Sequence, residues 1–148
     1  MSFAFGKRSE DALTSCDPRL TKVMREALRL SDVDFGVVQG ARTIEQQRDY
    51  FRKGNSRVNP DAYIGNLPKL YAAAKHITGP GMPFSRACDI IVSGKKSYDI
   101  PTLCYIAGVV LTCAKNMGVP MRSGINWDQD SEILTDQTLI DAVHFELV

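Results

Sequence analysis

The chain has 148 residues, of which 44% are apolar and 24% are charged, and its formal net charge is +1 at pH 7. This length and composition predict one globular domain with a buried core, and the small net charge gives no support for nucleic-acid binding. No segment approaches the roughly 18 consecutive apolar residues of a membrane span, and the N-terminus lacks the apolar stretch of a signal peptide. We therefore expect a protein that is made in the cytoplasm and does not insert into a membrane.

Neither the local charge nor the cysteine spacing predicts a binding site for an anionic polymer, a thiolate metal site or a disulfide. The locally basic stretch after residue 41 is interpreted as a solvated helix face rather than a site for an anionic polymer. Its cations are Arg42, Arg48, Arg52, Lys53 and Arg57. The cysteines show no C-x-x-C pair, so we expect reduced, mostly buried side chains rather than a thiolate metal site or disulfides. They are Cys16, Cys88, Cys104 and Cys113.

In chain order, the first predicted element is a helix at Pro18–Leu30, where apolar residues recur at helical spacing and Asp17 precedes a proline as N-cap. Residues 34–39 (DFGVVQ) predict a short buried strand. A second helix is predicted at residues 43–54, closed by a glycine. Arg42 then lies at the corner between strand and helix.

The second half of the chain begins with residues 55–81, whose Asn, Pro and Gly content predicts a long surface loop with a short helical piece near residues 67–74. Ala87–Val92 is a predicted strand, and residues 102–117 form a predicted apolar helix. A short strand at 120–122, an acidic loop (NWDQDSE), a few helical residues and a last strand at 144–148 follow. This order predicts an α+β fold with a small antiparallel sheet flanked by helices.

The two histidines of the chain each have an aspartate nearby: His76 precedes Asp89 in KHITGPGMPFSRACD, and Asp141 and His144 form DAVH. Zn²⁺ binds neutral imidazole nitrogen and carboxylate oxygen, and a catalytic zinc site has three protein ligands and an open position for water. Two histidines and one aspartate can supply the ligands, which leaves the second aspartate as a base beside the water. The pattern suggests a small zinc hydrolase.

Strand alternation predicts which side chains share a face. Asp89 lies opposite to Cys88, so the carboxylate can face a site while the thiol packs in the core. His144 and Glu146 share the other strand's polar face. Two interpretations of Glu146 remain open, an acceptor for the ring of a metal-bound histidine or a solvated edge residue.

These motifs resemble the zinc peptidase family that contains the D-alanyl-D-alanine carboxypeptidases and the phage L-alanyl-D-glutamate endolysins. AAKHITG…RACD and DAVH are similar to the family pattern S-x-H-x-x-G-x-A-x-D followed by [DE]-x-x-H. The resemblance implies a hedgehog/DD-peptidase-like fold, with residues 1–148 as one catalytic domain and no separate cell-wall-binding domain. It also implies that His76, Asp89 and His144 bind one zinc ion, Asp141 is the general base and Arg42 polarises the substrate.

Two positions depart from the family pattern. The segment PGMPFS lengthens the spacing between His76 and Asp89 and is interpreted as a loop insertion, which can be absorbed if both of its ends stay fixed. Ala74 stands where the family has a serine. All three implied zinc ligands are present.

The resemblance further implies a zinc-dependent endolysin that cleaves peptidoglycan stem peptides, at the L-alanyl-D-glutamate bond, in host cell lysis. Such a protein would be made in the host cytoplasm and act as a monomer on the cell wall after release across the inner membrane. The alternatives are a D-alanyl-D-alanine carboxypeptidase and, in another class, an inactive metal-bearing wall-binding module.

Simpler interpretations of individual residues also remain open. Arg42 could cap the second helix or pair with Glu45, and Asp141 could cap a turn before the last strand. Trp127 could be a cleft wall or a core anchor. For the acidic loop, a solvated loop is favoured over a Ca²⁺ site, because the full EF-hand pattern is missing. The acidic side chains concerned are Asp128, Asp130 and Glu132.

Overall fold

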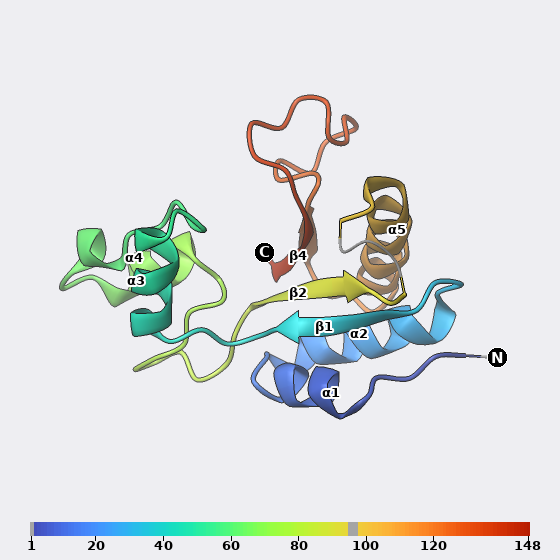
Figure 1. Ribbon diagram of the computed structural model, residues 1–148, viewed down its shortest axis with the longest axis horizontal. Coiled ribbons are helices and arrows are strands. Elements are labelled where there is room, and N and C mark those ends of the chain that lie inside the picture. The colour runs from blue at the N-terminus through green and yellow to red at the C-terminus, as the bar shows by residue number, and fades with distance from the viewer. Residues whose placement is uncertain (1, 95–97) are drawn as a thin grey trace.

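The computed structural model describes residues 2–94 and 98–148, and within these residues it contains five α-helices, one 3-10 helix and four strands (Figure 1). In chain order these are α1 (Lys7–Thr14), α2 (Pro18–Leu30), β1 (Phe35–Gln39), α3 (Ile44–Arg52), η1 (Pro60–Tyr63), α4 (Leu67–Ala73), β2 (Ala87–Val92), α5 (Ile100–Asn116), β3 (Met121–Gly124) and β4 (Asp141–Leu147).

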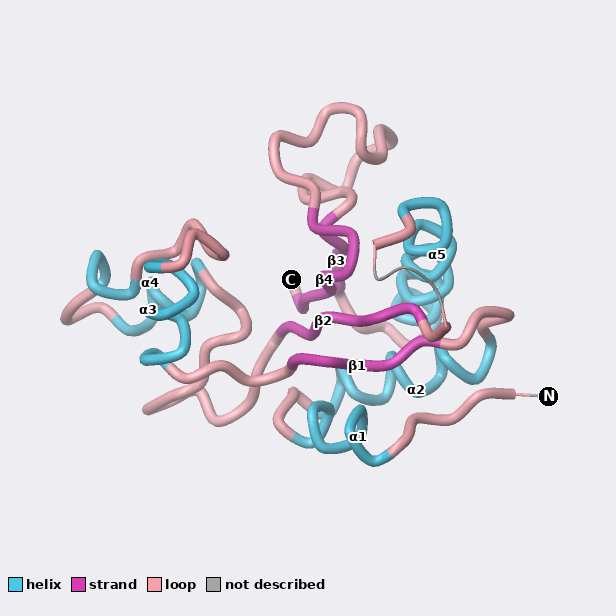
Figure 2. Tube along the Cα trace, viewed as in Figure 1, coloured by secondary structure: helices cyan, strands magenta, loops and turns pink. Residues whose placement is uncertain are grey.

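The four strands form one antiparallel sheet in the order β1-β2-β4-β3 (Figure 2). Asp89 on the central strand β2 lies opposite Gln39 on β1 and opposite His144 on β4. The pairing therefore brings residues from three distant parts of the sequence to one end of the sheet. The predicted α+β fold with a small antiparallel sheet is confirmed.

Most of the apolar core lies between the sheet and helices α1, α2 and α5. Phe35 of β1 and Phe145 of β4 are almost fully buried there, together with one face of each helix. Helices α3, η1 and α4 lie apart from this core, beyond the C-terminal end of β1 and the N-terminal end of β2 (Figure 1). They pack around a smaller cluster of buried residues, Leu70, Tyr71 and Ile77. The sheet thus joins a large core to a small lobe.

Local capping explains the helix starts that the sequence predicted. Asp17 accepts a hydrogen bond from the backbone N–H of Arg19 and precedes Pro18 at the first helical position of α2. Thr43 and Gln46 form a reciprocal capping box at the start of α3. Because Thr43 fixes where α3 begins, it also fixes the corner that holds Arg42.

Two expectations for the second half of the chain are corrected. The helical residues expected between the acidic loop and the last strand are absent, because residues 125–140 contain only turns and bends. There, side chains take the place of helical backbone partners: Asn126 exchanges hydrogen bonds with Asp130, and the Gln137 side chain accepts from the N–H of Trp127. The last strand also begins three residues earlier than predicted, at Asp141.

Two further helices extend the predicted organisation. Helix α1, at Lys7–Thr14, was not predicted as a separate element, and it buries Leu13 and lies against β1. The predicted long loop contains η1 in addition to the expected short helix α4. Within the described residues, the helices are all too short or too polar to span a membrane.

Candidate metal centre and active-site cleft

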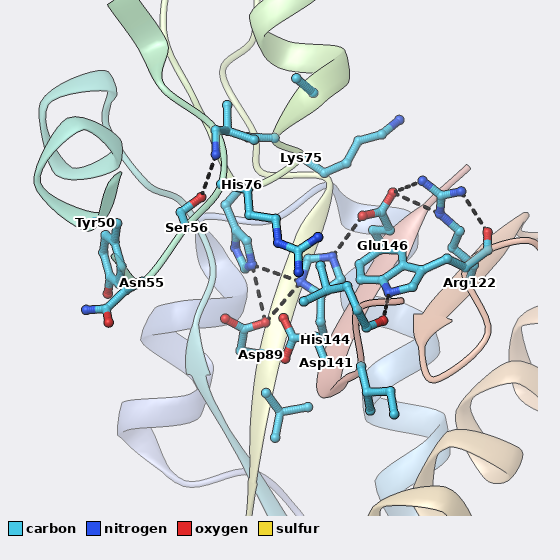
Figure 3. A pocket seen from close by; sticks show the side chains of 18 of the residues that line it. Tyr50, Asn55, Ser56, Lys75, His76, Asp89, Arg122, Asp141, His144 and Glu146 are labelled. Atoms are coloured by element: carbon cyan, nitrogen blue, oxygen red, sulfur yellow. Dashed lines mark hydrogen bonds and ion pairs between the residues drawn. The ribbon is translucent and has the colours of Figure 1, made fainter. Parts of the chain in front are cut away.

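The residues implied as zinc ligands meet at the floor of one cleft, between the lobe of α3 and α4 and the segment that leads into β4. His76 follows α4, Asp89 lies on β2 and His144 lies on β4. Figure 3 shows them at the centre, with Tyr50 and Ser56 on one side and Glu146 and Arg122 on the other. The cleft has a volume of about 1140 Å³.

Three potential ligand atoms converge on one point. Asp89 Oδ1 lies 3.3 Å from His76 Nε2 and 3.1 Å from His144 Nδ1, and these two nitrogens are 3.3 Å apart. Both histidines are almost fully buried, whereas the Asp89 side chain is 19% exposed and so opens toward the cleft. These atoms form a His/Asp/His group with the spacing needed to hold a metal ion.

In each histidine, one ring nitrogen points away from the shared centre, and the hydrogen-bond partner of that nitrogen determines the tautomer of the ring. His76 Nδ1 lies 2.7 Å from the carbonyl oxygen of Gly40, and His144 Nε2 lies 2.8 Å from Glu146 Oε1. Both oxygens accept hydrogen bonds, so these nitrogens carry the proton of the neutral ring. A cation that displaces any second proton from the ring would then meet the lone pair of the opposite nitrogen, which faces the centre. Two lone pairs and a carboxylate oxygen that face one another fit a cation, so the donor set fits Zn²⁺.

Glu146 is held in place by Arg122, which resolves its open assignment. Arg122 Nε and Nη2 donate to Glu146 Oε2 over 3.2 and 3.1 Å. The carboxylate is buried and serves as the acceptor for the His144 ring, rather than as a solvated edge residue. Hydrogen bonds with His144 and Arg122 hold the pKa of Glu146 below its usual range, even though burial, the largest influence, acts to raise it.

Trp127 forms part of the cleft wall. Its ring centre lies 5.3 Å from that of His144, and the Arg122 guanidinium lies 5.3 Å from the same ring centre. The indole N–H donates to the carbonyl oxygen of Leu139 over 2.8 Å. Trp127 therefore ties the segment before β4 to the metal-binding group, and it is a wall residue rather than a core anchor.

Electrostatics at the centre favour a positive charge. Burial would raise the pKa of Asp89, but hydrogen bonds with His144 and His76 outweigh it and hold that pKa well below its usual range. For His144, burial acts to lower the pKa, yet hydrogen bonds with Asp89 and Glu146 raise it to about 9. Both shifts mean that the surrounding carboxylates stabilise a cation between them.

Asp141 lines the same cleft, close to Asp89 and His144 (Figure 3). It is the first residue of β4 and pairs with Gly124 across an irregularity in the β3–β4 ladder. Its pKa is raised, first by burial and then by the negative charge of Asp89. A half-buried carboxylate with a raised pKa beside a metal-binding group suits proton transfer, as expected for a general base.

Arg42 reaches the cleft from the corner between β1 and α3. It does not pair with Glu45, which instead pairs with Arg48. Its backbone N–H donates to the carbonyl oxygen of His76 over 2.8 Å, so it is tied directly to the segment that carries a predicted ligand. Its guanidinium donates hydrogen bonds to Gln39 and Gln47 and lies over the ring of Tyr50.

The departures from the family pattern leave this arrangement intact. The inserted segment begins with a tight turn, in which Met82 and the preceding Gly79 exchange backbone hydrogen bonds of 3.0 and 2.9 Å. At its base, the N–H of Arg86 donates to the carbonyl oxygen of Lys75 over 2.9 Å. Both ends of the insertion are thus fixed, and Cys88 packs in the core as expected.

The acidic segment before β4 has a different grouping from the one that the sequence suggested. Carboxylates of Asp128, Asp130 and Asp136 lie within 4.8 Å of one another, and Glu132 is not part of this group. All three side chains are exposed. Exposed acidic groups of this kind are common without a bound ion.

Fold and site together define an α+β single-domain protein with an open cleft and, at its floor, a His/Asp/His group that could hold a metal ion. The chain belongs to the phage L-alanyl-D-glutamate peptidase family, whose model matches residues 1–148, and it is therefore a peptidase. It is 32% identical over 151 residues to the L-alanyl-D-glutamate peptidase of Escherichia phage T5, with 100% of both chains covered. The crystal structure of the Serratia marcescens L-Ala D-Glu endopeptidase ChiX is also similar, with a TM-score of 0.70 and 28% identity, over 99% of this chain and 91% of ChiX.

Proposed function

We propose that this chain is a zinc-dependent endopeptidase that cleaves the L-alanyl-D-glutamate bond in the stem peptides of bacterial peptidoglycan. The observation that carries the proposal is the convergence of two histidine lone pairs and the Asp89 carboxylate on one point in an open cleft. Family membership and the names of the two relatives support the same bond.

His76, Asp89 and His144 would hold the zinc ion, with Gly40 and Glu146 fixing the orientation of the two rings. The chemistry that zinc supplies when bound is activation of water and polarisation of a carbonyl oxygen. Asp141 takes the proton of the attacking water and passes it to the leaving amine of D-glutamate. Arg42 stabilises the negative charge that develops on the carbonyl oxygen of L-alanine.

In this proposal the substrate partner is the peptidoglycan of the host cell wall, and residues 1–148 act as one catalytic domain. The protein would be made in the host cytoplasm, would reach the wall after release across the inner membrane and would act as a monomer during lysis. Release across the inner membrane is needed because the peptidoglycan substrate lies outside that membrane.

Digestion of purified peptidoglycan by the zinc-loaded protein tests the proposal. We expect new amino termini on D-glutamate and solubilised wall, without free D-alanine or new reducing sugar ends. The control is the His76→Ala variant, which should lose zinc and activity together because one of three ligands is removed. Release of free D-alanine would establish the carboxypeptidase alternative, and retained zinc without any cleavage would establish the inactive binding module.

A further inference from the structure

The guanidinium of Arg42 is held by neutral groups. Nη1 donates to Gln47 Oε1 over 2.7 Å, Nη2 donates to Gln39 Oε1, and Cζ lies 4.1 Å from the centre of the Tyr50 ring. Gln39 also donates from Nε2 to the hydroxyl of Tyr50 over 3.1 Å. Two amide oxygens and one aromatic face therefore determine where the cation points.

The orientation of Gln47 is dictated by its other contacts. This side chain is fully buried, and its Nε2 donates to Ser56 Oγ over 2.8 Å and to the carbonyl oxygen of Val58 over 2.9 Å. With the amide nitrogen engaged there, Oε1 must face Arg42. The same contacts join Arg42 to residues 56–58, which line the cleft.

Arg42 makes no direct ion pair with any residue that the structure describes, and the carboxylates of Asp89 and Asp141 attract its charge without contacting it. Elsewhere in the described chain, Arg19, Arg25, Arg29, Arg48 and Arg122 each pair with a carboxylate. Arg42 is only 8% exposed, and its buried Nε has no hydrogen-bond partner. A buried cation with no paired anion costs stability, so this arrangement requires a compensating advantage.

We propose that Gln39 and Gln47 are positioning residues that hold Arg42 without pairing its charge directly, so that this charge stays available to the substrate. This inference rests on the proposed function, in which Arg42 stabilises a developing oxyanion. A carboxylate in place of either glutamine would hold the guanidinium equally well but would compete with the substrate for its charge. The neutral amides thus favour activity over stability.

Two substitutions of Gln39 separate the effect of a negative charge beside Arg42 from the effect of losing the side chain. Gln39→Glu keeps the size of the side chain and an acceptor for Arg42, and the Tyr50 hydroxyl can donate to the new carboxylate. Gln39→Ala removes both hydrogen bonds and adds no charge. The measurements are kcat and KM on soluble muropeptides, the zinc content and the Tm of the zinc-loaded proteins.

The two variants should rank in opposite orders: Gln39→Glu should be the more stable protein and Gln39→Ala the more active enzyme. For Gln39→Glu we expect kcat to fall about 10²-fold, as for loss of one oxyanion-stabilising donor, with zinc content unchanged and Tm raised by about 2–4 °C. Gln39→Ala should lower Tm and reduce kcat by less than Gln39→Glu does. If activity instead follows Tm, with Gln39→Ala the more damaging change, Gln39 has a merely structural role and the proposal is wrong.

A double variant shows whether the effect passes through Arg42. In an Arg42→Ala background, Gln39→Glu should change kcat by less than about twofold, because the charge that it neutralises is absent. A further large loss would overturn the proposal. If the wild-type protein binds zinc but cleaves no muropeptide, the proposed function fails, while the Tm order of the single variants still decides whether Arg42 is an uncompensated buried cation.

Discussion

At the scale of single residues, the site depends on which atom of each side chain faces the centre. The sequence indicated His76 and His144, but it left open which ring nitrogens were available. The structure shows that the Gly40 carbonyl and the Glu146 carboxylate bind the outer nitrogens. Gly40 had no signal in the sequence, because it acts through its backbone. For Glu146 the sequence offered the acceptor role as one of two interpretations, and the hydrogen bond to His144 selects it.

The base role of Asp141 gives a prediction at this scale. Asp141→Asn should keep the fold and the zinc content, because Asp141 is not one of the three convergent ligands. Turnover should fall on the order of 10²–10⁴-fold, the usual contribution of a general base. The measurement is kcat on peptidoglycan with parallel zinc analysis, and the matched control is Asp49→Asn, an exposed carboxylate on α3. Near-normal turnover in Asp141→Asn would assign the base to another residue.

At the scale of elements, regular patterns were predictable and irregular ones were not. Apolar periodicity and capping residues located α2, α3 and α5 to within a few residues, and alternation placed Cys88 in the core. Strict alternation would put Asp141 and His144 on opposite faces of β4. A shift in register opposite Gly124 lets both line the cleft. Such an irregularity depends on the partner strand, which a local sequence pattern does not contain.

That irregularity depends on Gly124, which gives a prediction at the scale of the element. A Cβ on residue 124 would lie 2.0 Å from the carbonyl oxygen of Asp141, so β3 and β4 must move apart. Gly124→Ala should destabilise the protein by about 1–3 kcal/mol, as overpacking does, and should lower kcat by displacing Asp141.

The measurements for Gly124→Ala are Tm and kcat, with Gly108→Ala in α5 as the matched control. A Cβ at Gly108 meets no atom within 4 Å, and alanine is the better helix former. The control should therefore gain about 0.5–1 kcal/mol of stability at unchanged kcat. Equal stability of the two variants would show that the close approach at Gly124 has no consequence.

At the scale of the whole molecule, the metal-binding group connects parts of the chain that fold into different clusters. His76 lies beside the small lobe of α3 and α4, whereas His144 belongs to a strand whose neighbour Phe145 is in the main core. The sequence indicated these residues through spacing and resemblance. The lobe was predictable only in part: α3 and α4 had local signals, whereas η1 and the packing of these helices around Leu70, Tyr71 and Ile77 depend on contacts that a local pattern does not contain.

Because the ligands come from both clusters, zinc binding should stabilise the fold as a whole. A ligand that binds only the native state at about 1,000 times its Kd adds roughly 4 kcal/mol of stability. For a chain of this size each kcal/mol shifts Tm by about 2–4 °C. Removal of zinc by a strong chelator should therefore lower Tm by about 8–16 °C by these two relations, and activity should be lost with it and return when Zn²⁺ is restored. Differential scanning calorimetry with and without chelator measures the shift. The control is His144→Ala, which lacks one ligand, so its Tm should change little when chelator or Zn²⁺ is added. A wild-type Tm that is the same in both conditions would mean that the three convergent side chains do not hold a metal ion.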